Sequence, residues 1–478
     1  MGSVPSILDN HSAEYSHNHV VPSQCSVTSK GTAVHHAGPN KRRKLWGYSE
    51  TPRPTSICRL PPNIVLEVVK NLDLQHIYSM TAVSRHFADI SIPYYLQSAG
   101  FVLHHQKMQR PSVQLSTTAS FAALNVWNRS SMWEPLHSLH CRFAYSADLA
   151  ELQARHLHLF LQSLPYPSTI PHVSTVTLII EGAERTRLTG VLKNLFVAGM
   201  HHLRIIHKGP AHFGLNLSPV CEWKDSRLVQ MDVHGLVIFS PDFSSFAGIQ
   251  NLSLHCASLT NHWANMLATV ILPNLQKFRL YGVLPCLSLM IFLGRHTLLQ
   301  SVRVIPSSDS DSMPLSKKCP KTSLPNIEYL DGPVKFVEAF LTCLDRPAEK
   351  LSSISIRPEK SSLRAPAVGK VFALAPPNLQ HIILHFPYDD DCKSFMDAAK
   401  IITTASLFDL WKLSIVRRGS DNHANSKIWF ENIVMWIKHF PAVRSVTVVE
   451  NGIPRLKRRL LEVCDFLPES DVFTIQSP

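Results

Sequence analysis

The sequence lacks paired cysteines, long apolar runs and a recognisable leader. Its 10 cysteines are scattered singly over 478 residues with no CxxC pair, which excludes zinc-ribbon and thioredoxin-like spacing. The longest apolar run, 283–294, is shorter than the roughly 20 residues that a membrane-spanning helix needs. The N-terminus has neither a charged start nor a long apolar stretch, so no signal peptide is expected. These absences predict a protein of a reducing compartment, the cytoplasm, the nucleus or both, without membrane contact.

Enzyme motifs are missing as well: there is no GxxxxGK[ST], GxGxxG, HExxH or GxSxG pattern. Five candidate zinc ligands lie close in sequence: His137, His140, Cys141, His156 and His158. Their spacing fits no standard zinc pattern, so surface and loop imidazoles are the preferred interpretation. Residues 389–391, three aspartates, precede an expected helix, where carboxylates cap free amides more often than they hold a metal. We therefore expect no enzymatic activity, no cofactor and no metal.

The composition is that of a globular protein with a basic balance. Apolar residues make up 45% and charged residues 17%, and the formal net charge is +12. This charge suits acidic partners of any kind. Residues 1–55 are rich in Ser, His, Asn and Pro without hydrophobic periodicity, which predicts a disordered tail. The basic cluster at 41–44 within it fits either a nuclear import signal or a solvated charge run.

Residues 56–96 carry the most specific pattern in the chain. A Leu-Pro pair opens it, a short helix and a Leu-Asp-Leu break follow, and a second helix leads into Val-Ser-Arg-x-Phe. We expect three short helices, with Met80, Val83 and Phe87 on one stripe of a helix over 79–87. This order of elements resembles an F-box, a docking module without chemistry. Pro62 stands where many F-boxes carry an acidic residue, and a Tyr-Tyr-Leu end replaces the usual Trp.

The resemblance implies that the segment binds a Skp-type adaptor and, through it, a cullin. The motif match implies these adaptor contacts: Leu60, Pro61, Ile64, Leu66, Val68, Leu72, Leu74, Ile77, Val83, Ser84 and Phe87. Some of these side chains must instead form the core of the module, and the sequence alone does not separate the two groups. A unit this small buries little surface by itself, so a partner that covers it is expected.

The rest of the chain divides into a connector and a repeat. Residues 97–168 are expected to be a mainly helical connector, with helices over 121–127 and 147–164. From 169 to 478 the pattern apolar-x-x-apolar-x-apolar recurs about every 20–30 residues. Each copy predicts a short parallel strand followed by a returning segment. The returning helices are expected at 188–197, 262–270, 287–295, 334–343, 393–404 and 428–439.

This repeat resembles leucine-rich repeats, although the Asn or Cys that this family places after the strand is not regularly present. The resemblance implies stacked units that bury a continuous core. The predicted fold class is α+β: a small helical F-box, a helical connector and an α/β leucine-rich-repeat-like solenoid. An F-box followed by a degenerate solenoid is similar to many fungal F-box proteins.

The outward strand positions of such a solenoid line its concave face, and here they are mainly basic. The candidate target-binding residues are Arg204, Lys277, Arg279, Arg303, Arg357 and Lys412. Only Asp232 and Asp331 oppose them. A basic concave face favours an acidic or phosphorylated target. Chance in a chain of net charge +12 is the other interpretation.

Together these features predict the substrate-recognition subunit of an SCF-type cullin ubiquitin ligase, in which the F-box binds the adaptor and the solenoid binds the target protein. One alternative is an F-box scaffold that acts outside ubiquitination. Another is a basic nuclear protein that binds nucleic acid through the solenoid. The basic run 455–459 has no interleaved aromatics and is interpreted as a helix face, so nucleic acid is not the expected partner.

Overall fold

The computed structural model describes the chain from residue 60 onwards, with gaps. The described residues are 60–104, 111–129, 135–164, 173–181, 191–192, 194–195, 199–208, 214–216, 227–235, 237–239, 246–256, 260–282, 284–306, 320–358, 363–386, 395, 407, 409–417, 436, 440, 442–450 and 472–476. The chain divides into two units, Met1–Thr55 and Ser56–Pro478, and every described residue belongs to the second. The expected tail, the basic clusters 41–44 and 455–459, and residues 389–391 lie outside the described residues.

Three short helices begin the described chain: α1 (Pro62–Lys70), α2 (Leu74–Met80) and α3 (Arg85–Ser98). Local side-chain caps set where the last two begin. The Asp73 carboxylate accepts a hydrogen bond from the backbone N–H of His76 at 2.9 Å, and the Ser84 hydroxyl accepts one from Phe87 at 3.3 Å. The predicted single helix over 79–87 is therefore wrong, because the cap at Ser84 starts a new helix after a turn.

Fifteen of the described strands form one long sheet, in which strands that follow each other along the chain lie side by side, apart from two strands that form a separate pair. Their order is β1 (Val102–His104), β2 (Ser112–Leu115), β3 (Leu136–Arg142), β4 (Val173–Ile180), β5 (His202–His207), β7 (Gln230–His234), β9 (Asn251–Cys256), β10 (Lys277–Gly282), β11 (Ser301–Ile305), β12 (Tyr329–Pro333), β13 (Ser353–Arg357), β14 (His381–Phe386), β15 (Lys412–Arg417), β16 (Ser445–Glu450) and β17 (Val472–Gln476). β1 pairs with β2 antiparallel, and each later pair is parallel. Two further strands, β6 (Gly214–Asn216) and β8 (Val237–Phe239), form a separate parallel pair.

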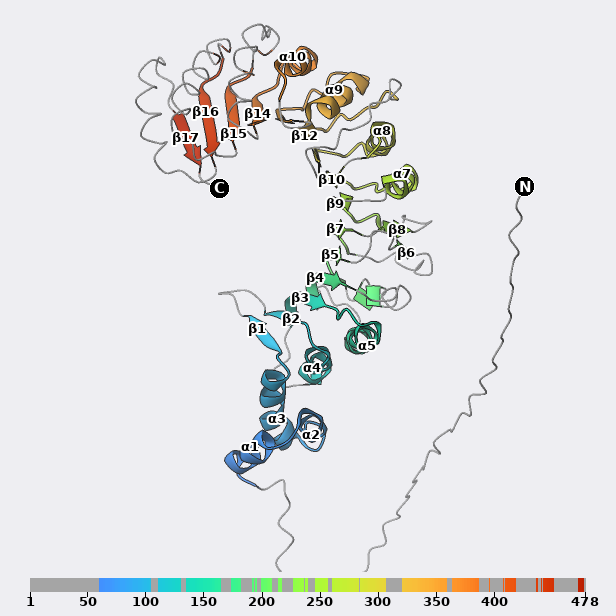
Figure 1. The fold of residues 1–478 in the computed structure, drawn as a ribbon, viewed down its shortest axis with the longest axis vertical. Helices are drawn as coiled ribbons and strands as arrows, with labels where there is room; N and C mark the ends of the chain where they lie inside the picture. Colours follow the sequence, from blue (N-terminus) through green and yellow to red (C-terminus); the bar gives the residue numbers. More distant parts are fainter. Residues whose placement is uncertain are drawn as a thin grey trace, which may run out of the picture. The chain divides into compact units, whose positions relative to one another are not determined.

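Helices return the chain between strands. They are α4 (Thr118–Arg129), α5 (Ala147–Ser163), α7 (Thr260–Thr269), α8 (Cys286–Gly294), α9 (Val334–Cys343) and α10 (Ala365–Leu374). Figure 1 shows α4, α5, α7, α8 and α9 on the same side of the strands. The helices expected at 121–127, 147–164, 262–270, 287–295 and 334–343 are confirmed, whereas α10 was not predicted. Most of 188–197, 393–404 and 428–439 lies outside the described residues.

The segment 97–168 is not simply a helical connector, because the sheet begins within it. It contains β1, β2 and β3, and β3 pairs in parallel with β4. The two inward residues of β2, Val113 and Leu115, are fully buried. β1 and β2 have only three and four residues, so their alternation was too brief to be distinguished from the surrounding helical pattern. β3 has seven residues, and its polar positions kept it from matching the recurring apolar pattern. The sheet therefore starts well before residue 169.

The core lies between the strands and the helices. In β10 the side chains of Phe278 and Leu280 are fully buried, whereas Lys277 and Arg279 are exposed. This period-two alternation follows from the pleat of the strand. It leaves a polar side of the sheet, opposite the helices, which we call the open face. The strand order is what stacked strand-return units give, and their assignment to a leucine-rich-repeat-like solenoid stays a prediction.

Three asparagines tie successive units together. They occur in the Leu-Pro-Asn-Leu, Leu-Pro-Asn-Ile and Pro-Pro-Asn-Leu segments that precede β10, β12 and β14. Each side-chain amide donates to a backbone carbonyl of the preceding unit: Asn274 to Ala247, Asn326 to Thr297 and Asn378 to Glu349. These bonds satisfy loop carbonyls that strand pairing leaves free. The sequence pattern showed the asparagines, but their partners lie in the neighbouring unit.

Candidate functional site

Helix α1 splits its apolar residues between two faces. Val65 and Val69 are buried against the neighbouring helices, whereas Ile64 and Val68 are 45% and 46% exposed. Residues four apart share one helix face, so the sequence places two apolar stripes side by side and only one of them fits the core of this small module. The outer stripe is left uncovered.

Other large apolar side chains of the helical module are exposed in the same way. Together with the outer stripe they form what we call the exposed apolar set: Leu60, Ile64, Val68, Tyr78 and Val83. Their exposed fractions range from 36% for Leu60 and Tyr78 to 60% for Val83. Burying one such side chain fully is worth roughly 1.5–3 kcal/mol. A partner that covered several of them would therefore gain much of its binding free energy here.

The structure sorts the predicted adaptor contacts into two groups. Leu60, Pro61, Ile64, Val68 and Val83 are exposed and free to meet a partner. The others are engaged within the module: Leu66, Leu72 and Leu74 are partly buried, Ile77 and Phe87 are core residues, and Ser84 caps α3. The prediction that Ile77 and Phe87 contact the adaptor is therefore corrected, because both side chains are buried in the core between the helices. Tyr78 is an exposed residue that the motif match did not single out.

All six predicted target-binding residues lie on strands of the sheet, yet they are not equivalent. Arg303 Nε lies 2.6 Å from Asp331 Oδ2, and Arg357 Nε lies 2.7 Å from Asp331 Oδ1. Asp331 itself is fully buried. Burial alone would raise the pKa of this carboxyl, but the hydrogen bond from Arg357 and the charges of both arginines outweigh it and lower the pKa. These two arginines therefore stabilise β11, β12 and β13 against one another.

A second carboxylate sits near the start of the basic surface. Asp232 on β7 accepts hydrogen bonds from His202 Nε2 at 3.0 Å and from Gln230 Nε2 at 3.3 Å. Burial alone would raise its pKa, but the hydrogen bond and charge of His202 prevail and the pKa is lowered. Arg204 is opposite Asp232 in the strand register. Asp232 is thus a fixed negative charge beside Arg204.

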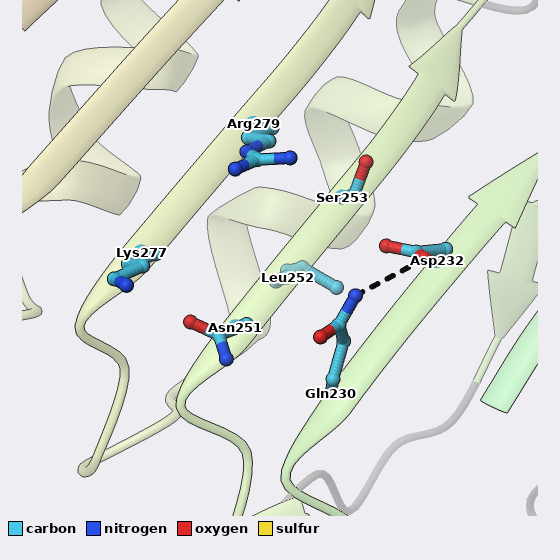
Figure 2. A pocket seen from close by; sticks show the side chains of 7 residues that line it. All are labelled: Gln230, Asp232, Asn251, Leu252, Ser253, Lys277 and Arg279. Atoms are coloured by element: carbon cyan, nitrogen blue, oxygen red, sulfur yellow. Dashed lines mark hydrogen bonds between the residues drawn. The ribbon is translucent and has the colours of Figure 1, made fainter. Parts of the chain in front are cut away.

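A hollow opens on the same face where β7, β9 and β10 run side by side (Figure 2). Its volume is about 140 Å³, and it is lined by Gln230, Asp232, Asn251, Leu252, Ser253, Lys277 and Arg279. The strand register places Asp232, Ser253 and Arg279 in one row across the three strands. The hollow therefore has a carboxylate on one wall, short polar side chains in the middle and two cations on the other wall.

The five candidate zinc ligands, for which the sequence favoured surface and loop imidazoles, are spread over two elements. His137, His140 and Cys141 lie on β3, and His156 and His158 lie on α5. Cys141 is fully buried, and burial raises the pKa of its thiol. Within the described residues there is no group of three or more His, Cys, Asp or Glu side chains placed to hold a metal ion. Of the helices that the structure covers, none has the length and apolar character of a membrane span.

Comparison with known proteins identifies one part of the chain. No curated protein matches the chain as a whole or in part. A model of the F-box domain matches residues 57–92, which include α1, α2 and the first half of α3. F-box domains in general bind Skp-type adaptors, which link them to a cullin. The exposed apolar set lies within the matched segment, and the chain thus contains an F-box domain at residues 57–92.

Proposed function

We propose that this protein is the substrate-recognition subunit of an SCF-type cullin ubiquitin ligase. The F-box helices bind a Skp-type adaptor, and the sheet that follows holds the target protein through its open face. The observation that carries the proposal is the exposed apolar set within an F-box match. An independently folded module would gain stability by burying such side chains, so their exposure points to a partner.

In this role the chain needs no bond-making residue. It positions the target near a ubiquitin-charged enzyme and so raises the effective concentration of the reacting groups. The two functions also separate in space along the chain: the exposed apolar set belongs to α1, α2 and their flanking turns, and the basic hollow belongs to β7, β9 and β10. A variant can therefore remove one without touching the other.

The test is adaptor binding by a variant that charges the outer stripe of α1, Ile64→Asp with Val68→Asp. Both side chains are about half exposed, so the helices should still fold. Because both side chains are already about half buried, covering each gains roughly half of the full-burial value, and losing both weakens binding by roughly 1.5–3 kcal/mol, which is about tenfold to a hundredfold. The measurement is titration of purified full-length protein with a Skp-type adaptor.

A matched control charges two exposed leucines elsewhere. Leu149 and Leu152 on α5 are 49% and 40% exposed and lie outside the F-box match. Leu149→Asp with Leu152→Asp should bind the adaptor like the unchanged protein. Equal adaptor affinity for the α1 variant and the unchanged protein would refute the assignment. Adaptor binding without co-purification of a cullin would instead support the scaffold alternative.

A further inference from the structure

A second hollow lies where the F-box helices meet the helices that follow them. It is lined by residues of α2, α3, α4 and α5 and has a volume of about 610 Å³. We call it the helical cavity, and it shares no lining residue with the hollow on the open face. Sites that enclose a small molecule usually measure roughly 300–1,000 Å³, so the helical cavity is large enough for one.

Hydrogen bonds between α4 and α5 fix one side of the helical cavity. Asn125 Nδ2 donates to the His156 carbonyl at 3.3 Å, and Asn128 Nδ2 donates to Ser163 Oγ at 2.7 Å. The Ser163 hydroxyl in turn donates to the Phe160 carbonyl at 2.6 Å. The side-chain oxygens of both asparagines accept no hydrogen bond from a residue that the structure describes, and both residues line the cavity. This side is therefore held in place before any ligand arrives and still offers acceptors.

Two tyrosines form the side that belongs to the F-box helices. The ring centroids of Tyr78 on α2 and Tyr95 on α3 lie 5.8 Å apart, with the rings tilted by 54°. Tyr95 lines the cavity although it is only 4% exposed, and its hydroxyl has no hydrogen-bond partner among the described residues. Burial and the neighbouring Tyr78 raise the pKa of Tyr95, so its O–H stays a donor. A buried hydroxyl is costly to leave unbonded, so an acceptor inside the cavity would be stabilising.

The helical cavity carries no full charge, although the chain has a formal net charge of +12. None of the described residues that line it is Lys, Arg, Asp or Glu. Burial, and to a lesser extent the charge of Arg155, lower the pKa of His156, so this imidazole is neutral at neutral pH. A charged ligand would leave water here without gaining a partner of opposite charge. The lining thus favours an uncharged ligand.

The same lining is a poor match for a helix of another protein. A helix uses its own backbone hydrogen bonds internally, so it brings only side chains into a groove and reads as a row of apolar anchors. The helical cavity instead sets the tyrosine hydroxyl and two amide oxygens against the apolar side chains of Leu74 and Leu159. A compact ligand with a ring body and its own oxygen atoms can meet both kinds of group at once.

We propose that the helical cavity binds an uncharged small molecule with a flat ring body and at least one oxygen that accepts a hydrogen bond. Tyr78 and Tyr95 pack against the rings, and the Tyr95 hydroxyl donates to the oxygen. Asn125 and Asn128 accept from a hydroxyl group of the ligand where it has one. This site goes beyond the proposed ligase role, because the outer stripe of α1 that carries adaptor binding does not line it.

The experiment is equilibrium dialysis of the full-length protein at neutral pH against uncharged fused-ring alcohols and ketones of two to four rings. The smallest probe is 2-naphthol, and its charged counterparts are 2-naphthoate and 2-naphthylmethylammonium. We expect members of the uncharged series to bind, and both charged counterparts to bind at least tenfold more weakly than 2-naphthol. Absence of binding by every uncharged compound, or equal binding of the charged counterparts, would overturn the proposal.

Two variants locate the bound probe. Ala122→Phe places a ring in the helical cavity and should weaken binding at least tenfold, whereas Ala373→Phe, at an exposed position of α10, should not. Tyr95→Phe removes only the oxygen atom and should weaken binding about three- to tenfold, the value of one neutral hydrogen bond. Tyr145→Phe is its control, because Tyr145 is 80% exposed and does not line the cavity. Tyr95→Phe carries the test if Ala122→Phe does not fold.

Equal affinity of each cavity variant and its control would show that the probe binds elsewhere and would overturn the proposal. Displacement of the probe by a Skp-type adaptor would assign the helical cavity to the adaptor interface and would overturn it too. The Ile64→Asp, Val68→Asp variant should bind the probe like the unchanged protein. Probe binding and adaptor binding can therefore fail independently of each other.

Discussion

Replacing Asp331 by asparagine tests whether Arg303 and Arg357 stabilise the sheet by pairing with this carboxylate or are instead available to bind a ligand. The carboxylate is fully buried and receives Arg303 from β11 and Arg357 from β13, the latter through two hydrogen bonds of 2.7 and 3.0 Å. Asparagine keeps the shape and removes the charge. The change leaves two guanidinium groups side by side with no compensating anion between them.

The loss of unfolding free energy depends on the two arginine charges that the substitution leaves without a carboxylate. Removing one partner of a buried ion pair typically costs about 3–5 kcal/mol, because an uncompensated charge stays in a low-dielectric site. Here the charges left behind are the arginines, whose side chains are 32% and 22% exposed, so water can reach them in part. We therefore expect Asp331→Asn to lower the free energy of unfolding by about 2–3 kcal/mol, toward the lower end of that range.

The assay is hydrogen exchange of the amides in β11, β12 and β13, together with a denaturant titration. A stack of units can unfold locally, so exchange in these three strands is the more direct measurement. Asp345→Asn serves as the control, because that carboxylate is exposed in the loop after α9 and should change neither measurement. Exchange in β11–β13 that stays the same in Asp331→Asn would refute the role of the ion pairs.

The pH dependence provides a second measurement on the same residue. The folded protein lowers the pKa of Asp331, so its stabilising contribution is present above the unfolded value of about 4 and is lost as the pH falls through the folded pKa. Asp331→Asn should therefore lose less stability on acidification below about pH 4 than the unchanged protein does. Two freed arginines should also raise the affinity of the open face for an oligonucleotide.

Two further predictions concern single residues that shape the units around the hollow. His296 is buried, accepts a hydrogen bond from the Leu272 N–H at 2.9 Å and donates one to the Phe292 carbonyl. His296→Phe leaves these two backbone groups without their partner, so the free energy of unfolding measured in a denaturant titration should fall by about 1–3 kcal/mol. Burial lowers the pKa of His296, so its contribution should be complete above about pH 6.5 and decline below it, and a variant as pH-sensitive as the unchanged protein would contradict this. Gly282 ends β10 at φ +126°, and a Cβ there would lie 2.3 Å from the Cys256 carbonyl oxygen. Gly282→Ala should therefore introduce roughly 1–3 kcal/mol of backbone strain and lower the melting temperature. Gly100→Ala is the control, since φ is +69° but nothing lies within 4 Å of the added Cβ, and similar losses in both variants would show that the close approach does not matter.

The F-box segment shows which structural features can be predicted from neighbouring residues in the sequence. The Leu-Pro opening, the break at Asp73 and the apolar spacing are properties of neighbouring residues, so the sequence alone was enough to predict three short helices and a resemblance to an F-box. The Ser84 cap that starts α3 was missed, and the predicted helix over 79–87 was wrong for that reason. Which stripe of α1 faces inward depends on the position of α3, because Ile64 and Val65 are equally apolar. Only the packed module could assign one to the surface and the other to the core.

The sheet divides in the same way between sequence and tertiary structure. Its strands from β4 onwards followed from the recurring apolar pattern, since alternation is set by the pleat of each strand. The start of the sheet in 97–168, the bonds from the loop asparagines and the pairing of Asp331 with two arginines did not, because each depends on how neighbouring units align with one another. The sequence by itself determined that this protein has an F-box segment and a series of strands with basic outward positions. The tertiary structure alone decided which apolar side chains stay exposed and which arginines pair with a carboxylate, because both depend on the residues that pack against them from other elements.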